Sequence, residues 1–283
     1  MSNQTQAKET VHASFTGSIP EIYDACLGPL LFEFSAQDMA ARVKGKNPQG
    51  GKVLEVACGT GISTYYLRQA LPESIEITAT DLNPAMLDFA KEKSRDVNLP
   101  GVTFEVADAL SLPFDDQSFD VVACQFGIMF FPDKGAGLAE MMRVLKPGGT
   151  LVFNVWDSLE KNKPASIAHE TIGKFFESDP PQFMKTPFGF YDIDHIEGLM
   201  SQAGFVDIES HNVSEKLEVQ EVTNLAKGFV EGNPGVLEIN ERATVKADVV
   251  TQKVAEELTK IYGPTPFEIE LQEIIFTAKK PVR

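Results

Sequence analysis

Acidic residues and a pair of glycines occupy positions from which they could bind a nucleoside-containing ligand. Cys58-Gly-Thr-Gly61 contains small residues that let a backbone turn sharply and approach a ligand closely. Asp81 follows these glycines by about 20 residues, the spacing at which a carboxylate accepts hydrogen bonds from ribose hydroxyls. Asp108-Ala109 offers a carboxylate for an adenine amine and a backbone N–H for a ring nitrogen. Together with Glu55 and Gln125, these residues predict one ligand site.

Each feature also has a structural explanation when it is taken alone. Asp81 could be an acid at the start of a helix that begins near Asn83-Pro84. Asp108 could cap a turn into Leu110, and residues 146–149 (Lys-Pro-Gly-Gly) could form only a turn. Their order and spacing along the chain favour a shared site over four unrelated features.

The segments that would position these residues alternate between strand and helix. Val53 to Val56 is a short apolar run typical of a buried strand, and residues 62–71 have helical spacing. Continued alternation predicts an α/β fold with a parallel sheet, and such sheets bind ligands at the carboxyl ends of their strands. The strands are expected at 53–56, 75–81, 102–107, 119–125, 150–156, 205–216 and 267–276, and further helices at 36–43, 84–95, 134–145 and 192–203.

Four other segments do not follow this alternation. Residues 1–14 are predicted to be a disordered tail, and residues 15–34 are rich in aromatic residues but interrupted by glycine and proline, which argues against one long helix. Residues 157–190 and 219–262 are predicted to be helical insertions. We expect a single domain over 15–283, with a helical cap at 15–45, a ligand-binding core at 46–156, and the two helical insertions at 157–190 and 219–262.

The composition excludes several classes of partner. The chain has 25 Lys and Arg against 41 Asp and Glu, a net charge of −16, which repels nucleic acid and anionic membranes. Cys26, Cys58 and Cys124 are too few and too scattered for a disulfide framework or a zinc site, and no other spacing indicates a metal. The polar start and the lack of a long apolar run predict a cytoplasmic protein without membrane insertion. A homodimer is left open.

The sequence resembles the class I S-adenosylmethionine-dependent methyltransferases, most closely the ubiquinone/menaquinone-methyltransferase-like small-molecule branch. The resemblance rests on Val53-Leu-Glu-Val-Ala-Cys-Gly-Thr-Gly61, Asp81-Leu-Asn-Pro-Ala-Met86, Val106-Ala-Asp-Ala-Leu-Ser-Leu-Pro-Phe114, Phe119-Asp-Val-Val122 and Arg143-Val-Leu-Lys-Pro-Gly-Gly-Thr150. It implies a Rossmann-like, mostly parallel seven-stranded sheet of order 3-2-1-4-5-7-6 with an antiparallel last strand. It also implies S-adenosyl-L-methionine as cofactor and S-adenosyl-L-homocysteine as product.

The resemblance also implies roles for individual residues. Gly59 and Gly61 would line the methionine half of the cofactor, and Glu55 would bind its ammonium group. Asp81 would hold the ribose. The remaining cofactor-binding positions implied are Leu82 and Met86 against the adenine ring, Asp108 and Ala109 at its edge, Gln125 and Phe126 at the methionyl end, Phe15 and Tyr23 over the site, and Ala57 where the family often has a glycine.

Two alternatives to a methyltransferase remain. The chain could be an S-adenosylmethionine-binding protein without catalytic activity. It could also be an NAD-dependent oxidoreductase, although Gly59-x-Gly61-x-x-Thr64 lacks the third glycine of the dinucleotide motif.

The acceptor is expected to be a small molecule. Enzymes of this class that methylate adenine or glutamine amides typically have Asn/Asp-Pro-Pro-Tyr/Phe after the fourth strand, whereas this chain has Cys124-Gln-Phe-Gly127. Phe126, Ile128, Met129 and Phe130, with aromatic residues of 157–190, suggest an apolar or aromatic acceptor. His169 and His195 are the candidates for a general base, and proximity alone is the alternative mechanism.

Overall fold

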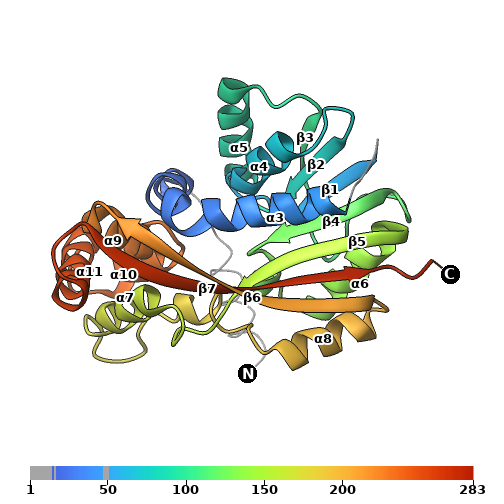
Figure 1. Cartoon of the computed structure of the whole chain (residues 1–283). Coiled ribbons are helices and arrows are strands. Elements are labelled where there is room, and N and C mark those ends of the chain that lie inside the picture. Colours follow the sequence, from blue (N-terminus) through green and yellow to red (C-terminus); the bar gives the residue numbers. More distant parts are fainter. Residues whose placement is uncertain (1–14, 16, 47–50, 283) are drawn as a thin grey trace.

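A seven-stranded sheet forms the centre of the protein, as the computed structural model shows for residues 15, 17–46 and 51–282 (Figure 1). The strand order is β3-β2-β1-β4-β5-β7-β6. All neighbouring strands are parallel except β7, which is antiparallel to both β5 and β6. The order and the antiparallel strand predicted from the sequence are confirmed. The strands are β1 (Lys52–Val56), β2 (Glu76–Asp81), β3 (Val102–Val106), β4 (Phe119–Gln125), β5 (Leu145–Trp156), β6 (Val206–Val219) and β7 (Phe267–Lys279).

Helices cover both faces of this sheet. On one face, α3 (Glu33–Gly45) and α4 (Ile62–Ala70) form an apolar core with the inward residues of β1, β4 and β7. On the other face, α6 (Lys134–Val144) and α8 (Ile193–Gln202) pack beside the opposite side chains of the same strands. Helix α5 (Pro84–Val97) connects β2 to β3. Because both faces are covered, the central strands are buried, and their carboxyl ends form one edge of the sheet.

The N-terminal cap is one continuous helical run from Ile19 to Gly45, so the prediction that residues 15–34 do not form part of one long helix is wrong. The segments α2 (Ile19–Ile22), the π-helix η1 (Tyr23–Phe32) and α3 follow each other without a loop. Pro29 lies inside η1. A proline lacks an N–H and its ring clashes with the carbonyl of the preceding turn, and the wider π-helical turn accommodates both effects. The predicted tail at 1–14 lies outside the described residues.

Residues 146–149 are part of β5, so the separate turn predicted there is also wrong. Phe119 pairs with Leu145 and Val121 pairs with Thr150, which leaves four residues of β5 bulging between consecutive partners. Gly148 and Gly149 exchange backbone hydrogen bonds with Lys280 beyond the end of β7. Because β7 supplies these partners, the segment remains attached to the sheet despite its turn-like sequence.

The two predicted insertions are helical. Helix α7 (Lys163–Gly173) and the short 3-10 helices η2 (Ile128–Phe130) and η3 (Phe183–Lys185) lie near the carboxyl edge of the sheet. Helices α9 (Val222–Glu231), α10 (Gly235–Arg242) and α11 (Ala247–Tyr262) lie between β6 and β7 and gather with α7 at one end of the molecule (Figure 1). Within the described ranges, no helix is long and apolar enough to cross a membrane.

Candidate active site

A cavity of about 540 Å³ opens at the carboxyl ends of β1, β2 and β4. Its wall includes most of the residues that the sequence analysis assigned to the cofactor. These are Phe15, Tyr23, Ala57, Gly59, Asp81, Leu82, Met86, Asp108, Ala109, Gln125 and Phe126. Glu55 and Gly61 are adjacent to the cavity in sequence but do not line it. The loops that follow β1, β2, β3 and β4 thus meet at one edge of the sheet.

The loop after β1 uses left-handed backbone conformations to turn around the cavity. Gly59 and Gly61 have φ angles of +57° and +80°, and Ala57 has +57°. A side chain in this region costs about 1 kcal/mol, so Ala57 adopts it under strain. Gly127 leaves the space that the Ala57 side chain occupies, since a Cβ on Gly127 would lie 2.5 Å from the Ala57 Cβ. Residue 57 is therefore a tight packing position in the floor of the site.

Asp81 connects the loop after β2 to the loop after β1. Its Oδ2 accepts from the Gly59 backbone N–H at 2.9 Å, and its Oδ1 accepts from the Asn83 N–H at 2.8 Å. Burial raises the pKa of the Asp81 carboxyl, and these two N–H donors oppose the rise. The hydrogen bond from Asn83 is the one expected of an acid at the start of a helix, but Asp81 also lines the cavity. Each carboxylate oxygen retains a lone pair for a further donor.

Glu55 is fully buried beneath the loop and bonds to helix α4. Its Oε2 accepts from the Thr64 hydroxyl at 2.6 Å, and its Oε1 accepts from the Ser63 hydroxyl. Burial raises the Glu55 pKa to about 7, although both hydroxyls favour the ionised form. Ser63 itself lines the cavity, so Glu55 acts on the cavity wall through this hydroxyl.

Asp108 has the turn-capping bond that its structural explanation requires. Its Oδ1 accepts from the Leu110 N–H at 2.9 Å, and Asp108 forms a backbone bridge with Ser111. The side chain is nevertheless exposed at the cavity wall beside buried Ala109. The cap fixes the loop conformation and leaves the second carboxylate oxygen for a ligand.

Two buried polar atoms in the cavity wall have no hydrogen-bond partner among the residues that the structure describes. These are Oε1 of Gln125, whose Nε2 donates to the Phe32 carbonyl at 3.2 Å, and Oγ1 of Thr60. An unpaired buried polar atom costs about 1–3 kcal/mol, which a ligand can recover. One atom is an acceptor and the other can donate. The pair therefore fits a ligand that carries both a cationic donor and an anionic acceptor.

The N-terminal cap covers the cavity. The Asn83 side chain donates to the Phe15 carbonyl at 2.9 Å, and Lys93 of α5 pairs with Asp24 of η1 at 2.7 Å. The Phe15 ring contacts Tyr23, Phe130 and Phe183 edge-on, with centroid distances of 5.7, 6.2 and 6.4 Å. Phe15 therefore lies where the cap, the loop after β4 and η3 meet.

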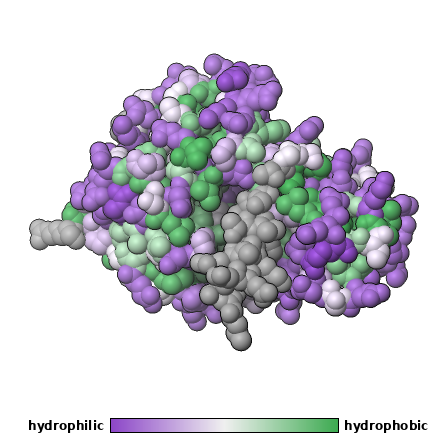
Figure 2. Space-filling view, turned by 180° about the vertical axis from the view of Figure 1, so that it is seen from behind, coloured by the Kyte–Doolittle hydropathy of each residue, from purple (hydrophilic) through white to green (hydrophobic). Residues whose placement is uncertain are grey.

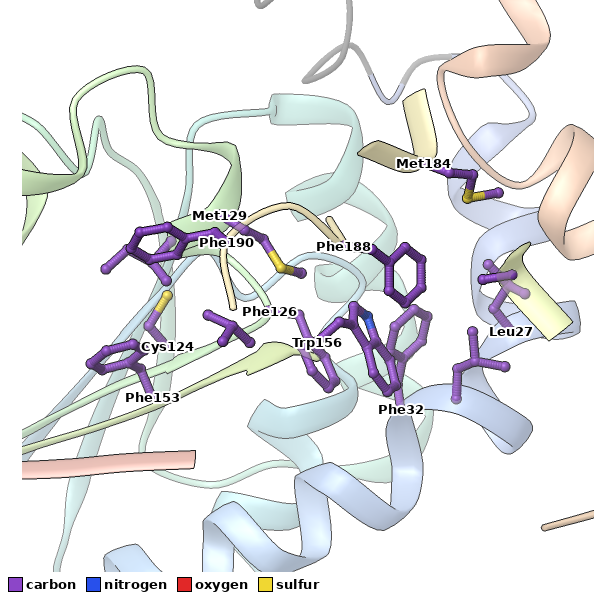
Figure 3. Packing of buried hydrophobic residues seen from close by; sticks show 14 of the residues in the cluster. Leu27, Phe32, Cys124, Phe126, Met129, Phe153, Trp156, Met184, Phe188 and Phe190 are labelled. Carbon is purple, nitrogen blue, oxygen red and sulfur yellow. The ribbon is translucent and has the colours of Figure 1, made fainter. Parts of the chain in front are cut away.

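A smaller apolar cavity of about 60 Å³ adjoins the first. Phe15, Tyr23, Phe32, Phe126 and Phe130 line both cavities. Figure 3 shows Phe32, Phe126, Trp156 and Phe188 clustered, with Leu27 and Met184 beyond them. The Phe126 and Trp156 rings stack at 4.1 Å. The other residues of its wall are Leu27, Leu31, Met129, Trp156, Met184, Pro187, Phe183, Phe188, Phe229 and Asn233.

Sequence reasoning found only part of this second wall. It named Met129, Phe130 and Phe126 and, in general, the aromatic residues of 157–190, which include Phe183 and Phe188. It missed Trp156 at the end of β5 and Phe229 on α9. The position of Trp156 at the carboxyl end of the fifth strand was an available signal, because strand ends gather at this edge of the sheet.

Neither histidine proposed as a base lies in the two cavities. His169 on α7 is half-buried against Ile172 and Met184, and burial lowers its pKa. His195 on α8 is exposed and contacts the Phe190 ring edge-on. Among the residues that the structure describes, no group of three or more His, Cys, Asp or Glu could hold a metal ion.

Residues 6–219 match the model of the ubiE/COQ5 methyltransferase family. The chain belongs to this family. It is 33% identical over 224 residues to a protein named demethylmenaquinone methyltransferase from Staphylococcus epidermidis, an alignment that covers 74% of this chain and 90% of the relative. A protein of the same name from Staphylococcus aureus is 30% identical over 230 residues, with the same coverage. The chain is therefore a methyltransferase, and its methyl donor is S-adenosyl-L-methionine.

The fold is also that of solved methyltransferases. Phosphoethanolamine N-methyltransferase 2 of Haemonchus contortus, solved with S-adenosyl-L-methionine, superposes with a TM-score of 0.59 at 19% identity, covering 97% of this chain and 60% of that one. At this identity the comparison concerns the fold alone. It agrees with the sheet order of Figure 1.

Proposed function

We propose that this methyltransferase transfers the methyl group of S-adenosyl-L-methionine to a planar, apolar acceptor of the quinone class. The observation that carries the proposal is the pair of adjoining cavities, one with the polar groups of a nucleoside site and one lined by aromatic rings. The staphylococcal relatives have names that specify a demethylated menaquinone as substrate. A quinone ring is flat and apolar, which matches the second cavity.

The polar residues of the larger cavity fit the donor. Asp81 would accept from the ribose hydroxyls, and Leu82 and Met86 would pack against the adenine, whose edge Asp108 and Ala109 would bind. The unpaired Oε1 of Gln125 would accept from the ammonium group, and the Thr60 hydroxyl would donate to the carboxylate. Glu55 would act through Ser63, since both of its oxygens bond to hydroxyls of α4.

Phe126 lies between the two sites because its ring lines both cavities. The bound donor supplies an electrophilic methyl group on a sulfonium. The protein's part is to align the acceptor with it and to exclude water, which Phe15 and Tyr23 do by covering the junction. The same proposal divides the chain into a cap at 15–45, a donor-binding core at 46–156 and two insertions on the acceptor side.

The acceptor cavity supports a mechanism by proximity. Tyr23 is the one ionisable residue among the described residues that line this cavity, and burial raises the pKa of its phenol above the usual value. A neutral phenol is a poor base, so the acceptor must carry its nucleophilic electrons on arrival, as the anion of a reduced quinone does.

The direct test is methyl transfer from labelled S-adenosyl-L-methionine to a panel of acceptors. Reduced naphthoquinones with and without an isoprenoid chain should be methylated, and phosphoethanolamine should not. Methylation of charged acceptors alone would contradict the acceptor class. Binding of the donor without any turnover across the panel would favour a protein that has lost catalysis.

A further inference from the structure

A buried chain of hydrogen bonds runs across the sheet from β7 to the junction of the two cavities. Glu273 Oε2 accepts from Asn154 Nδ2 at 2.7 Å, and Asn154 Oδ1 accepts from the Phe126 backbone N–H at 3.0 Å. Gln125 is paired with Asn154, and Asn154 with Ile275, two residues beyond Glu273. Side chains alternate along a strand, so Glu273 and Asn154 project from the same face, beneath α3.

Burying a carboxylate at this position costs free energy of folding. Glu273 and Asn154 are fully buried, and no donor among the described residues bonds to Oε1 of Glu273 in good geometry, although the nearby Ser35 hydroxyl of α3 lowers the pKa of the carboxyl. Replacing such a group with an apolar one of similar size is often neutral or stabilising. Glu273 nevertheless fixes the orientation of the Asn154 amide, because its Oε2 accepts from the amide N–H and so turns the amide oxygen to the other side. The amide oxygen is thereby held toward Phe126.

Phe126 requires this support because its backbone is strained. Its φ angle is +50°, a left-handed conformation that is unfavourable for a bulky residue. The Asn154 hydrogen bond holds this conformation, and with it the ring that stacks on Trp156 (Figure 3). Glu273 is also the ladder partner of Trp156 across β5 and β7. Trp156 and Glu273 therefore project from the same face of the sheet.

We propose that Glu273 is a positioning residue for methyl transfer, which acts through Asn154 to hold the Phe126 ring between the donor and acceptor sites. The expected change in kcat rests on the proposed function. The expected change in the stack of Phe126 on Trp156 does not, because Trp156 is the single tryptophan of the chain and its emission reports directly on that stack.

The test compares variants of Glu273 in the full chain. Glu273→Leu removes the acceptor, Glu273→Asp keeps the charge but withdraws it by one methylene, and Glu273→Gln retains an acceptor oxygen of the same reach. We expect the first two to lower kcat about tenfold or more while the donor Kd stays within about threefold. Glu273→Gln should restore both kcat and the wild-type Trp156 emission. Thr277→Val, which loses a buried hydroxyl elsewhere on β7, is the matched control and should alter neither.

The inference is overturned if Glu273→Leu and Glu273→Asp keep wild-type kcat and emission, or if Glu273→Gln is as impaired as they are. If Glu273→Leu does not fold, the comparison of Glu273→Asp with Glu273→Gln is sufficient to test the inference. Absence of methyl transfer in the wild-type protein would contradict the proposed function instead, and the emission of Trp156 would still test the hydrogen-bond chain.

Discussion

The Asp81 carboxylate accepts a hydrogen bond from the Gly59 backbone N–H at 2.9 Å, so the last residue of the second strand holds the loop after the first. The same carboxylate accepts from Asn83 at the start of α5. One side chain thus fixes the two loops that form the donor half of the cavity. This double role makes Asp81 the most informative position for testing the site.

Replacing Asp81 with alanine should weaken donor binding by about 2–3 kcal/mol, roughly 100-fold in Kd, because ribose hydroxyls and the Gly59 N–H both lose an acceptor. Titration calorimetry with S-adenosyl-L-methionine and S-adenosyl-L-homocysteine measures the loss. Asp88→Ala, an exposed change on α5, serves as the control. An Asp81→Ala protein with wild-type affinity would mean that the donor binds elsewhere.

Thr60→Val separates ligand binding from stability. The Thr60 hydroxyl has no partner within the described protein and lines the donor cavity, so removing it should not lower the free energy of unfolding. If the hydroxyl donates to the donor's carboxylate, Kd should rise about 10-fold or more. Calorimetry and thermal unfolding on the same sample give both numbers. An unchanged Kd would remove Thr60 from the site.

Phe229→Leu should change the acceptor and spare the donor. Phe229 is buried on α9 and lines the smaller cavity but not the larger one, so the shorter side chain makes room on the acceptor side and leaves the donor site unchanged. We expect the acceptor KM to change by about threefold or more, since one missing group in an apolar pocket is worth about 1–3 kcal/mol. Leu225→Val on the same helix does not touch either cavity and is the control. Equal effects of the two variants would refute the assignment.

Stability should depend on pH through Glu273. Burial raises its pKa from 4.5 to about 7, while the Ser35 hydroxyl, the Asn154 amide and Arg42 lower it and Asp38 raises it. The folded state therefore binds the proton more tightly than the unfolded state between about pH 4.5 and 7. Across this window, rising pH destabilises the wild-type protein relative to Glu273→Gln, by roughly 3 kcal/mol at most. Denaturant unfolding of both proteins at pH 5 and 8 measures the difference, and parallel curves would contradict it.

Most of the lining of the larger cavity could be predicted from the sequence because its determinants are local. Asp81 is the last residue of β2, Gly59 and Ala109 lie within three residues of the ends of β1 and β3, and parallel strands bring their carboxyl ends to one edge of a sheet. Glu55 was assigned to the same site, yet its oxygens bond to Ser63 and Thr64, since helical geometry in α4 turns both hydroxyls back toward β1.

The wall of the smaller cavity could not be predicted in full because its residues come from segments that are far apart in the sequence. Trp156, Phe183 and Phe229 meet only once the helices beside the sheet are packed. The hydrogen bond between Asn154 and Glu273 joins residues 119 positions apart, and no local pattern indicates it. The expectation that a proline interrupts a helix was also wrong at Pro29, where a π-helical turn continues the helix.

Helices α9, α10 and α11 occupy a single excursion whose two ends are neighbours, because Val219 of β6 pairs with Phe267 of β7. The excursion begins after the stretch that matches the family model. Its length can therefore differ without any change in the strand order of the sheet. Under the proposed function, substitutions in this excursion would alter the choice of acceptor and spare donor binding, because Phe229 and Asn233 line the smaller cavity and not the larger one.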